Sequence, residues 1–188
     1  MVEEDLEWGW EKESELKPEA QHWHQWNGHS PELEFCNYAK QLITLLKPML
    51  VLETGTGQGY LTRRTVPVMP DISRYVCFET LPEFVEKMKD HYIFQNGLAE
   101  VICGTLDPTL ASQADLTIID SAGGPGRIKE IETWWNAAKP GALALIHDVS
   151  QRHPPVTTHY RHYEYVKTLK IPGVFMTNPR GSFLGQKP

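Results

Sequence analysis

The chain has 188 residues, with 40% hydrophobic content and a formal net charge of −6 at pH 7. This length can bury the core of one domain, and the acidic balance argues against binding to nucleic acid. No apolar run approaches the roughly 20 residues of a membrane span, and the acidic N-terminus is no signal peptide, so we expect a cytoplasmic protein. Cysteines are few and widely spaced, which excludes a disulfide framework or a zinc pattern. We expect all three to fill core space: Cys36, Cys77 and Cys103.

Helices and strands are predicted to alternate from residue 30 onward. A first helix should begin at Ser30-Pro31 and end before Lys47-Pro48, because its apolar residues recur at helical spacing. The strand 49–53 then enters a glycine-rich turn. A short helix should follow from residue 60, limited by the prolines at 67 and 70.

The rest of the chain continues this alternation. Thr80 and Glu83 match a capping box, which predicts that Thr80 caps a helix that begins at Leu81 and ends before Gly97. The other predicted strands are 75–78, 99–103, 116–119, 142–146, 173–177 and 182–184, and the other helices are 128–138 and 158–169. Alternation of this kind predicts an α/β fold: a Rossmann-like, doubly wound, mostly parallel sheet of seven strands, with a C-terminal antiparallel hairpin and helices on both faces.

The glycine-rich turn is the main functional signal. Residues 51–60 read V-L-E-T-G-T-G-Q-G-Y, with glycines at 55, 57 and 59. Such a backbone can turn with positive φ and approach a ligand closely. The third glycine comes one residue too early for a dinucleotide fingerprint, and no Gly-Lys-Ser/Thr follows for a triphosphate. The glycines alone are also compatible with a tight connection in another kind of α/β protein.

An acidic-x-G-x-G-x-G run after an apolar strand resembles motif I of the class I S-adenosylmethionine-dependent methyltransferases. Asp120 follows the predicted strand 116–119, and His147-Asp148 ends the strand 142–146. Together with Trp134-Trp135 and a Lys-Pro-Gly break, these residues resemble the small-molecule O-methyltransferase branch, in particular methyltransferase family 24. The resemblance covers roughly residues 30–188, and residues 1–29 would form a separate N-terminal arm.

The resemblance implies S-adenosylmethionine as cofactor, bound along the carboxyl ends of the strands. Glu79 would accept hydrogen bonds from both ribose hydroxyls; its alternative role is a helix-entry acid beside Thr80. The adenine end fits less well, because Thr105-Leu106 precede Asp107. The implied cofactor-binding residues are Glu53, Thr54, Gly55, Gly57, Gly59, Tyr60, Glu79, Thr80, Thr105, Leu106, Asp120 and Ser121.

The same resemblance implies methyl transfer to a small-molecule acceptor, with a hydroxyl oxygen as the expected nucleophile. The candidate catalytic residues are Asp120, His147 and Asp148, and either of the last two could take the acceptor's proton. Polar contacts at a strand end and in a loop remain the alternative for this pair. A non-catalytic adenosyl-ligand-binding or assembly protein with the same fold is the second functional hypothesis.

A metal site is the less favoured alternative for these three residues. In metal-dependent relatives the equivalent positions hold a divalent cation, but a histidine in the set suits Mg²⁺ poorly, so we expect no metal. His153, His159 and His162 form a second histidine group, which we interpret as a solvent-facing helix surface without a metal.

Aromatic residues are concentrated before residue 30. Four tryptophans lie in the first 26 residues, and so aromatic a segment should not stay free in water. We expect the arm to pack on the domain; a lid over the active site and a contact within a homodimer remain alternatives. The four residues are Trp8, Trp10, Trp23 and Trp26.

Overall fold

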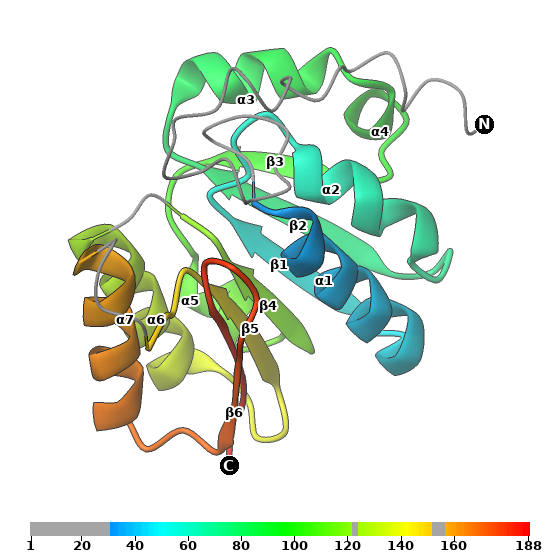
Figure 1. Ribbon diagram of the computed structural model, residues 1–188. Helices are drawn as coiled ribbons and strands as arrows, with labels where there is room; N and C mark the ends of the chain where they lie inside the picture. The colour runs from blue at the N-terminus through cyan, green and yellow to red at the C-terminus, as the bar shows by residue number, and fades with distance from the viewer. Residues whose placement is uncertain (1–30, 122–123, 152–156) are drawn as a thin grey trace.

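A single seven-stranded sheet forms the centre of the computed structural model, which describes residues 31–121, 124–151 and 157–188. The strand order is β3-β2-β1-β4-β5-β7-β6 (Figure 1). The strands are β1 (Leu50–Thr54), β2 (Arg74–Glu79), β3 (Glu100–Cys103), β4 (Leu116–Ile119), β5 (Leu143–His147), β6 (Gly173–Met176) and β7 (Ser182–Gln186). The pairings among the first five strands are parallel, and β7 is antiparallel to both of its neighbours. The predicted fold class is confirmed.

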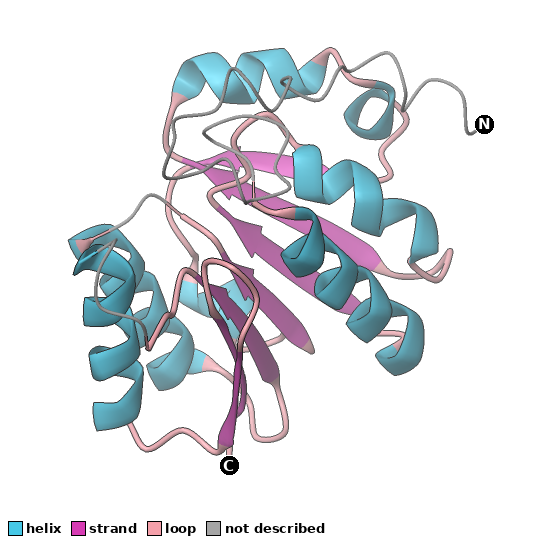
Figure 2. Cartoon of the chain, viewed as in Figure 1, coloured by secondary structure: helices cyan, strands magenta, loops and turns pink. Residues whose placement is uncertain are grey.

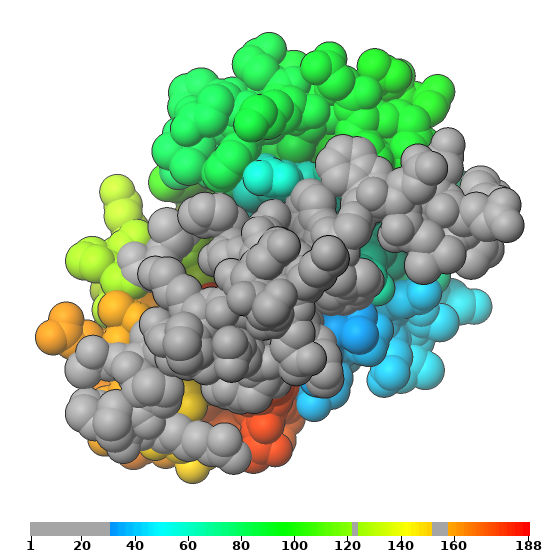
Figure 3. Space-filling model, turned by 45° about the horizontal axis from the view of Figure 1, so that its top comes forward, coloured from blue at the N-terminus to red at the C-terminus, as the bar shows by residue number. Residues whose placement is uncertain are grey.

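Helices cover both faces of this sheet (Figure 2). They are α1 (Leu33–Leu46), α2 (Tyr60–Thr65), η4 (Val66–Val68), α3 (Pro82–Lys89), α4 (Tyr92–Gln95), α5 (Pro108–Ala111), α6 (Pro125–Ala137) and α7 (Thr157–Thr168). One apolar cluster joins the sheet to α5, α6 and α7, with Trp134 fully buried in it. A second cluster joins the opposite face to α1, α2 and α4, around Phe35. The space-filling view places α3 and α4 at one end of the molecule and α7 at the other (Figure 3).

Local capping explains where the helices differ from prediction. The helix expected from Leu81 to the stop at Gly97 is divided, since the His91 ring accepts the Ile93 N–H and starts the separate helix α4. Thr80 does not cap α3: the N-cap is Leu81, without a side-chain hydrogen bond. The carboxylate of Glu79 accepts the Leu81 N–H instead. The capping-box prediction is therefore wrong.

One of the three cysteines also departs from expectation. Cys36 and Cys77 are buried as predicted, but Cys103 is exposed. It is the last residue of β3, an edge strand whose side chains are mostly exposed. An edge strand with an uncovered face does not require an apolar core residue at its end.

Two further expectations concern a membrane span and the N-terminal arm. In the described residues, no helix is long and apolar enough to cross a membrane. The predicted arm, residues 1–29, lies outside the described residues, and so do its roles as a lid or a dimer contact.

Candidate functional site

The glycine loop follows β1 at the point where the strand order reverses. The neighbours of β1 are β2 and β4, and a doubly wound sheet binds its ligand outside the carboxyl ends of strands at such a switch. Gly55 has φ 68°, and a Cβ at this position would lie 2.2 Å from the Cα of Ser121. Only glycine allows the loop to pass so close to the end of β4. Gly59, with φ 75°, is the N-cap of α2, which begins at Tyr60.

Glu79 connects the glycine loop to the end of β2. Its Oε2 accepts the Gly57 N–H at 2.7 Å, and its Oε1 accepts the Leu81 N–H at 3.0 Å. A carboxylate has about four acceptor sites, so lone pairs remain for a ligand. Glu79 is thus a helix-entry acid and also faces the loop. The ribose role stays a prediction that this geometry allows, and Thr80 is exposed beside it.

Glu53, the residue before the end of β1, is buried against α2 and β2. Its carboxylate is buried and accepts hydrogen bonds from Tyr75 Oη at 2.6 Å and Thr62 Oγ1 at 2.8 Å. Burial raises the pKa of Glu53 to about 8, although these two hydrogen bonds oppose the shift. In this arrangement Glu53 supports α2 and β2, and its predicted cofactor contact gains no support.

Two hydroxyl groups are buried at the same edge of the sheet. Thr54 ends β1, and Ser121 follows β4 by two residues. Among the described residues, neither hydroxyl makes a hydrogen bond of ordinary geometry. Both lie near the Glu130 carboxyl of α6, whose pKa is raised by burial while the two hydroxyls oppose that shift. The three side chains therefore form a buried polar group beneath this edge of the sheet.

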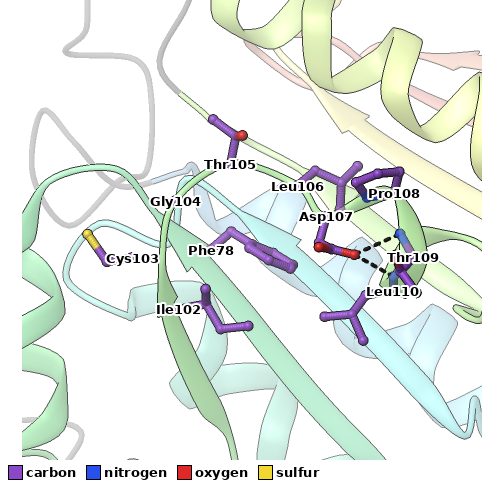
Figure 4. Close-up of a pocket in the computed structure, with 10 residues that line it drawn as sticks. All are labelled: Phe78, Ile102, Cys103, Gly104, Thr105, Leu106, Asp107, Pro108, Thr109 and Leu110. Carbon is purple, nitrogen blue, oxygen red and sulfur yellow. Dashed lines mark hydrogen bonds between the residues drawn. The ribbon is translucent and has the colours of Figure 1, made fainter.

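An open pocket of about 620 Å³ lies beside the end of β3 (Figure 4). Phe78, Ile102 and residues 103–110, from the end of β3 into α5, line it, so the predicted adenine contacts Thr105 and Leu106 are part of its wall. The Asp107 side chain caps α5, because its Oδ1 accepts the N–H groups of Thr109 and Leu110. That capping explains the short helix that sequence periodicity missed.

A group of charged side chains, called here the rim cluster, fills the space next to the ends of β4 and β5. Its members are Glu32, Asp120, Arg127, His147, Asp148 and Arg180. The His147 ring lies between two carboxylates: Nδ1 is 2.6 Å from Asp120 Oδ1, and Nε2 is 2.6 Å from Glu32 Oε2. Asn178 donates a further hydrogen bond to Glu32.

Two arginines complete the rim cluster. Arg127 Nη1 is 2.7 Å from Asp148 Oδ2, and its Nη2 is 3.3 Å from Asp120 Oδ1. Arg127 also donates to the backbone carbonyls of Ser121 and His147, at the ends of β4 and β5. Arg180 contacts both oxygens of Asp148, with Nε 2.6 Å from Oδ1 and Nη2 2.8 Å from Oδ2.

These contacts set the charges of the cluster. Burial lowers the pKa of His147, but Asp120, Glu32 and Asp148 outweigh burial and raise it to about 9. Burial alone would raise the pKa of Glu32, yet His147 and Arg180 hold it below its usual value. Against the same effect of burial, His147, Arg180 and Arg127 hold the pKa of Asp148 well below its usual range. At neutral pH, His147 is therefore an imidazolium between carboxylates.

This geometry bears on the catalytic prediction. The structure brings Asp120, His147 and Asp148 together as expected, but His147 is fully buried, with both ring nitrogens engaged. A protonated, enclosed imidazole cannot accept a proton from a substrate at pH 7. The arrangement favours a positioning role for His147. Asp120, whose side chain is 11% exposed, is the most accessible of the three candidates.

The three candidate metal ligands do not fit a divalent cation in this arrangement. Asp120, His147 and Asp148 offer ligand atoms within 4.8 Å of one another. However, the ring nitrogens of His147 already contact Asp120 and Glu32, and the oxygens of Asp148 are paired with two guanidinium groups. A cation here would have to displace arginines that already neutralise the carboxylates.

The second histidine group contradicts the prediction of a solvent-facing surface. His162 is fully buried: its Nε2 accepts the Gly124 N–H at 3.1 Å, and its Nδ1 lies 3.0 Å from the Asp148 carbonyl oxygen. His159 Nε2 lies 3.3 Å from Asp148 Oδ1. Burial lowers the pKa of His159 to about 4. Arg180 and Arg127 act in the same direction, and Asp148 opposes them. Both rings tie α7 to the site, and His153 lies outside the described residues.

Sequence reasoning missed several residues of the site. Glu32, Arg127 and Arg180 carry half of the rim cluster, but they lie far from one another in the sequence and match no motif. Arg180 belongs to the turn 178–181, where only the proline and glycine gave a local signal.

Known proteins resemble the chain in fold. An O-methyltransferase from Bacillus cereus in complex with S-adenosylhomocysteine (SAH) superposes with a TM-score of 0.69 at 16% identity, covering 86% of this chain and 84% of that one. An SAH-bound methyltransferase from Podospora anserina has a TM-score of 0.68 at 17% identity, with 100% and 89% coverage. An O-methyltransferase from Streptomyces achromogenes, in complex with S-adenosylmethionine, has a TM-score of 0.66 at 15% identity, with 85% and 82% coverage.

At these identities the likeness shows the fold alone, and no curated protein matches the chain. A family model described as a methyltransferase domain matches residues 52–149. This span runs from β1 through the glycine loop to the residue after Asp148, and it includes Glu79, Asp120 and His147. Because the match extends over more than half of the sequence, the chain belongs to methyltransferase family 24.

Proposed function

We propose that the chain transfers a methyl group from S-adenosylmethionine to a small-molecule acceptor, with a hydroxyl oxygen as the nucleophile. Family membership supports methyl transfer. The solved structures of similar fold that carry this cofactor or its demethylated product support the choice of donor. Two of them, from Streptomyces achromogenes and Bacillus cereus, are O-methyltransferases, which supports the choice of oxygen. The family match favours this enzyme over a non-catalytic adenosyl-binding protein.

One observation carries the proposal: the Glu79 carboxylate lies between the glycine loop and the helix entry, with acceptor capacity left over. The β3 pocket opens beyond the end of the neighbouring strand. A sugar held by Glu79 would leave its base beside Thr105 and Leu106 and its amino-acid tail at Gly55 and Gly57. This order follows the carboxyl ends of β3, β2 and β1, which are adjacent in the sheet.

The chain's own residues would contribute binding and alignment. S-adenosylmethionine supplies an electrophilic methyl group on a sulfonium, so the protein mainly has to orient the acceptor and exclude water. Asp120 is the most solvent-exposed carboxylate of the rim cluster, and we propose it as the group nearest the acceptor. His147 and Asp148 would hold Asp120 and the end of β5 in place. A cytoplasmic location and a homodimer through residues 1–29 belong to the same proposal.

The first test is binding of SAH to the full chain. A ligand at 100 times its Kd stabilises the folded state by about 2.7 kcal/mol, which corresponds to a rise in Tm of about 5 °C or more at this chain length. Replacing Glu79 with alanine should weaken SAH binding at least about tenfold, because hydrogen bonds to a charged group contribute about 1.5–3 kcal/mol. Isothermal titration calorimetry measures the affinity directly.

Two variants serve as controls. Glu79→Gln keeps one acceptor oxygen for the Gly57 N–H and should bind SAH more tightly than Glu79→Ala. Glu83→Ala removes an exposed acid from the first turn of α3 and should bind SAH like the wild type. Absence of any Tm shift at millimolar SAH, or unchanged affinity in Glu79→Ala, would contradict the proposed site. SAH production from S-adenosylmethionine with hydroxylated acceptors then separates an enzyme from a binding protein.

A further inference from the structure

The charges of the rim cluster balance without a metal ion. It contains three carboxylates, from Glu32, Asp120 and Asp148, and three cationic groups, from Arg127, Arg180 and the His147 imidazolium. Every carboxylate contacts at least one cation at 2.6–2.8 Å. Buried charges are stable only when they are paired and hydrogen-bonded. A divalent cation would add two positive charges, and the cluster has no further carboxylate to compensate them.

Arg127 occupies the position between the two aspartates that a bridging cation would need. Its guanidinium contacts both Asp120 and Asp148, at 3.3 and 2.7 Å, and its side chain is only 3% exposed. The same group donates to the carbonyls of Ser121 and His147. A single planar guanidinium thus fixes the ends of β4 and β5 relative to each other, with the directional hydrogen bonds that a spherical ion lacks.

Arg180 closes the cluster from the β6–β7 turn. It contacts both oxygens of Asp148, at 2.6 and 2.8 Å, and its side chain is 16% exposed. Asp148 therefore has a guanidinium on each side. Its carboxylate is committed to two arginines, and the imidazole of His147 is committed to two other carboxylates.

We propose that methyl transfer by this chain is independent of divalent cations, because the guanidinium groups of Arg127 and Arg180 take the place and the charge of a cation between Asp120 and Asp148. The part of this inference that concerns methyl transfer rests on the proposed function. The statement about the cluster itself depends only on its contacts. Arg127 is on this account a positioning residue, which holds Asp120 toward the acceptor side of the sheet.

The first experiment measures cations on the full chain. After dialysis against EDTA and then buffer, Mn²⁺ and Mg²⁺ are titrated by calorimetry, and SAH affinity is measured with EDTA and with MgCl₂. We expect no stoichiometric cation binding and an SAH affinity that agrees within about twofold between the two buffers, a difference below 1 kcal/mol. One tightly bound cation per chain, or methyl transfer that EDTA abolishes and Mg²⁺ restores, would overturn the proposal.

The second experiment removes one arginine at a time. Arg127→Gln and Arg180→Gln each leave the cluster with one excess negative charge, so each should gain Mn²⁺ affinity of at least about tenfold over the wild type. The melting temperature of each variant should then rise with added Mn²⁺, whereas that of the wild type should not. Arg74→Gln is the matched control: it removes the same charge from an exposed pair with Glu100, at the other end of the strands.

The variants also address folding and the separate failure of the proposed function. If Arg127→Gln does not fold, the less buried Arg180→Gln supplies the same reading. Folded variants that gain no Mn²⁺ response would overturn the assignment of the arginines to the cation position. If the wild type fails to bind SAH in either buffer, the proposed function fails, while the cation titrations still report on the cluster.

Discussion

Two glutamates at the ends of neighbouring strands show how residue position decides role. Glu53 is one residue before the end of β1, and Glu79 is the last residue of β2. The register pairs Glu53 with Cys77, two residues before Glu79, so both acids point to the same face of the sheet. Glu53 is covered there by Thr62 of α2. Glu79 extends past that cover to the glycine loop and remains able to accept a ligand.

The pH dependence of folding should report the charge of His147. Its pKa is raised to about 9 in the folded chain from an ordinary value near 6.5, so protonation stabilises the folded state. This contribution is present in full below about pH 6.5 and is lost as pH rises through 9. A shift of this size is equivalent to about 3 kcal/mol. Urea unfolding from pH 6 to 10 should therefore show a steady loss of stability.

Two variants isolate that effect. Glu53 also has a raised pKa, about 8, so its deprotonation likewise lowers the free energy of unfolding as pH rises from about 4.5 to 8. The pH series is therefore run in Glu53→Gln, with and without the additional change His147→Gln. The double variant should show a flatter profile between pH 6.5 and 9. Parallel profiles would mean that His147 is not charged in the folded chain.

At the scale of elements, hydrophobic periodicity predicted the strands and the long helices within a few residues. Apolar runs and their breaks mark β1, β4 and β5 clearly, because parallel strands buried on both faces are nearly continuous runs of apolar residues. The short helix α5 was not predicted, and α4 was expected only as the last turn of the helix before it. Each is only 4 residues long, too short for a periodic signal, and depends on a side chain, His91 or Asp107, that accepts backbone N–H groups. Such contacts form only in the folded chain and leave no periodic pattern in the sequence.

The junction between β1 and β4 should tolerate no side chain at position 55. Gly55→Ala would add the cost of an alanine at φ 68° and a clash with the Ser121 backbone, which a Cβ would approach to 2.2 Å. We expect a loss of more than about 2 kcal/mol in the free energy of unfolding, together with weaker SAH binding, since the left-handed conformation alone costs about 1–2 kcal/mol. Urea unfolding and calorimetry measure the two effects.

Gly97 provides the matched comparison for that prediction. It has the same φ of 68°, and a Cβ there would meet nothing within 4 Å. Gly97→Ala should therefore show the conformational cost alone and leave SAH affinity unchanged. Equal losses in the two variants would show that the close approach of the loop to β4 has no energetic consequence.

At the scale of the whole molecule, the candidate site is assembled from segments that the sequence keeps far apart. The strand-end residues Asp120, His147 and Asp148 could be predicted, because parallel strands place their carboxyl ends at one edge. Their partners could not. Glu32 lies 115 residues before His147 and 146 before Asn178, and no local pattern connects these positions. Glu32 and Asn178 also lie outside residues 52–149, the span of the family match.

Glu32 should therefore anchor α1 and the C-terminal turn to the centre of the fold. Its carboxylate is fully buried and accepts from the His147 imidazolium and from Asn178. Glu32→Ala would leave the buried rim cluster with one excess positive charge and break a buried ion pair, which typically costs about 3–5 kcal/mol. Glu86→Ala, at an exposed pair with Lys89, should cost less than about 1 kcal/mol. Urea unfolding of both variants and of Glu32→Ala/Asn178→Ala tests the linkage. If the losses from Glu32→Ala and Asn178→Ala are simply additive, the two ends of the chain are not energetically coupled through Glu32, whereas a smaller combined loss is the result expected for residues in one hydrogen-bonded network.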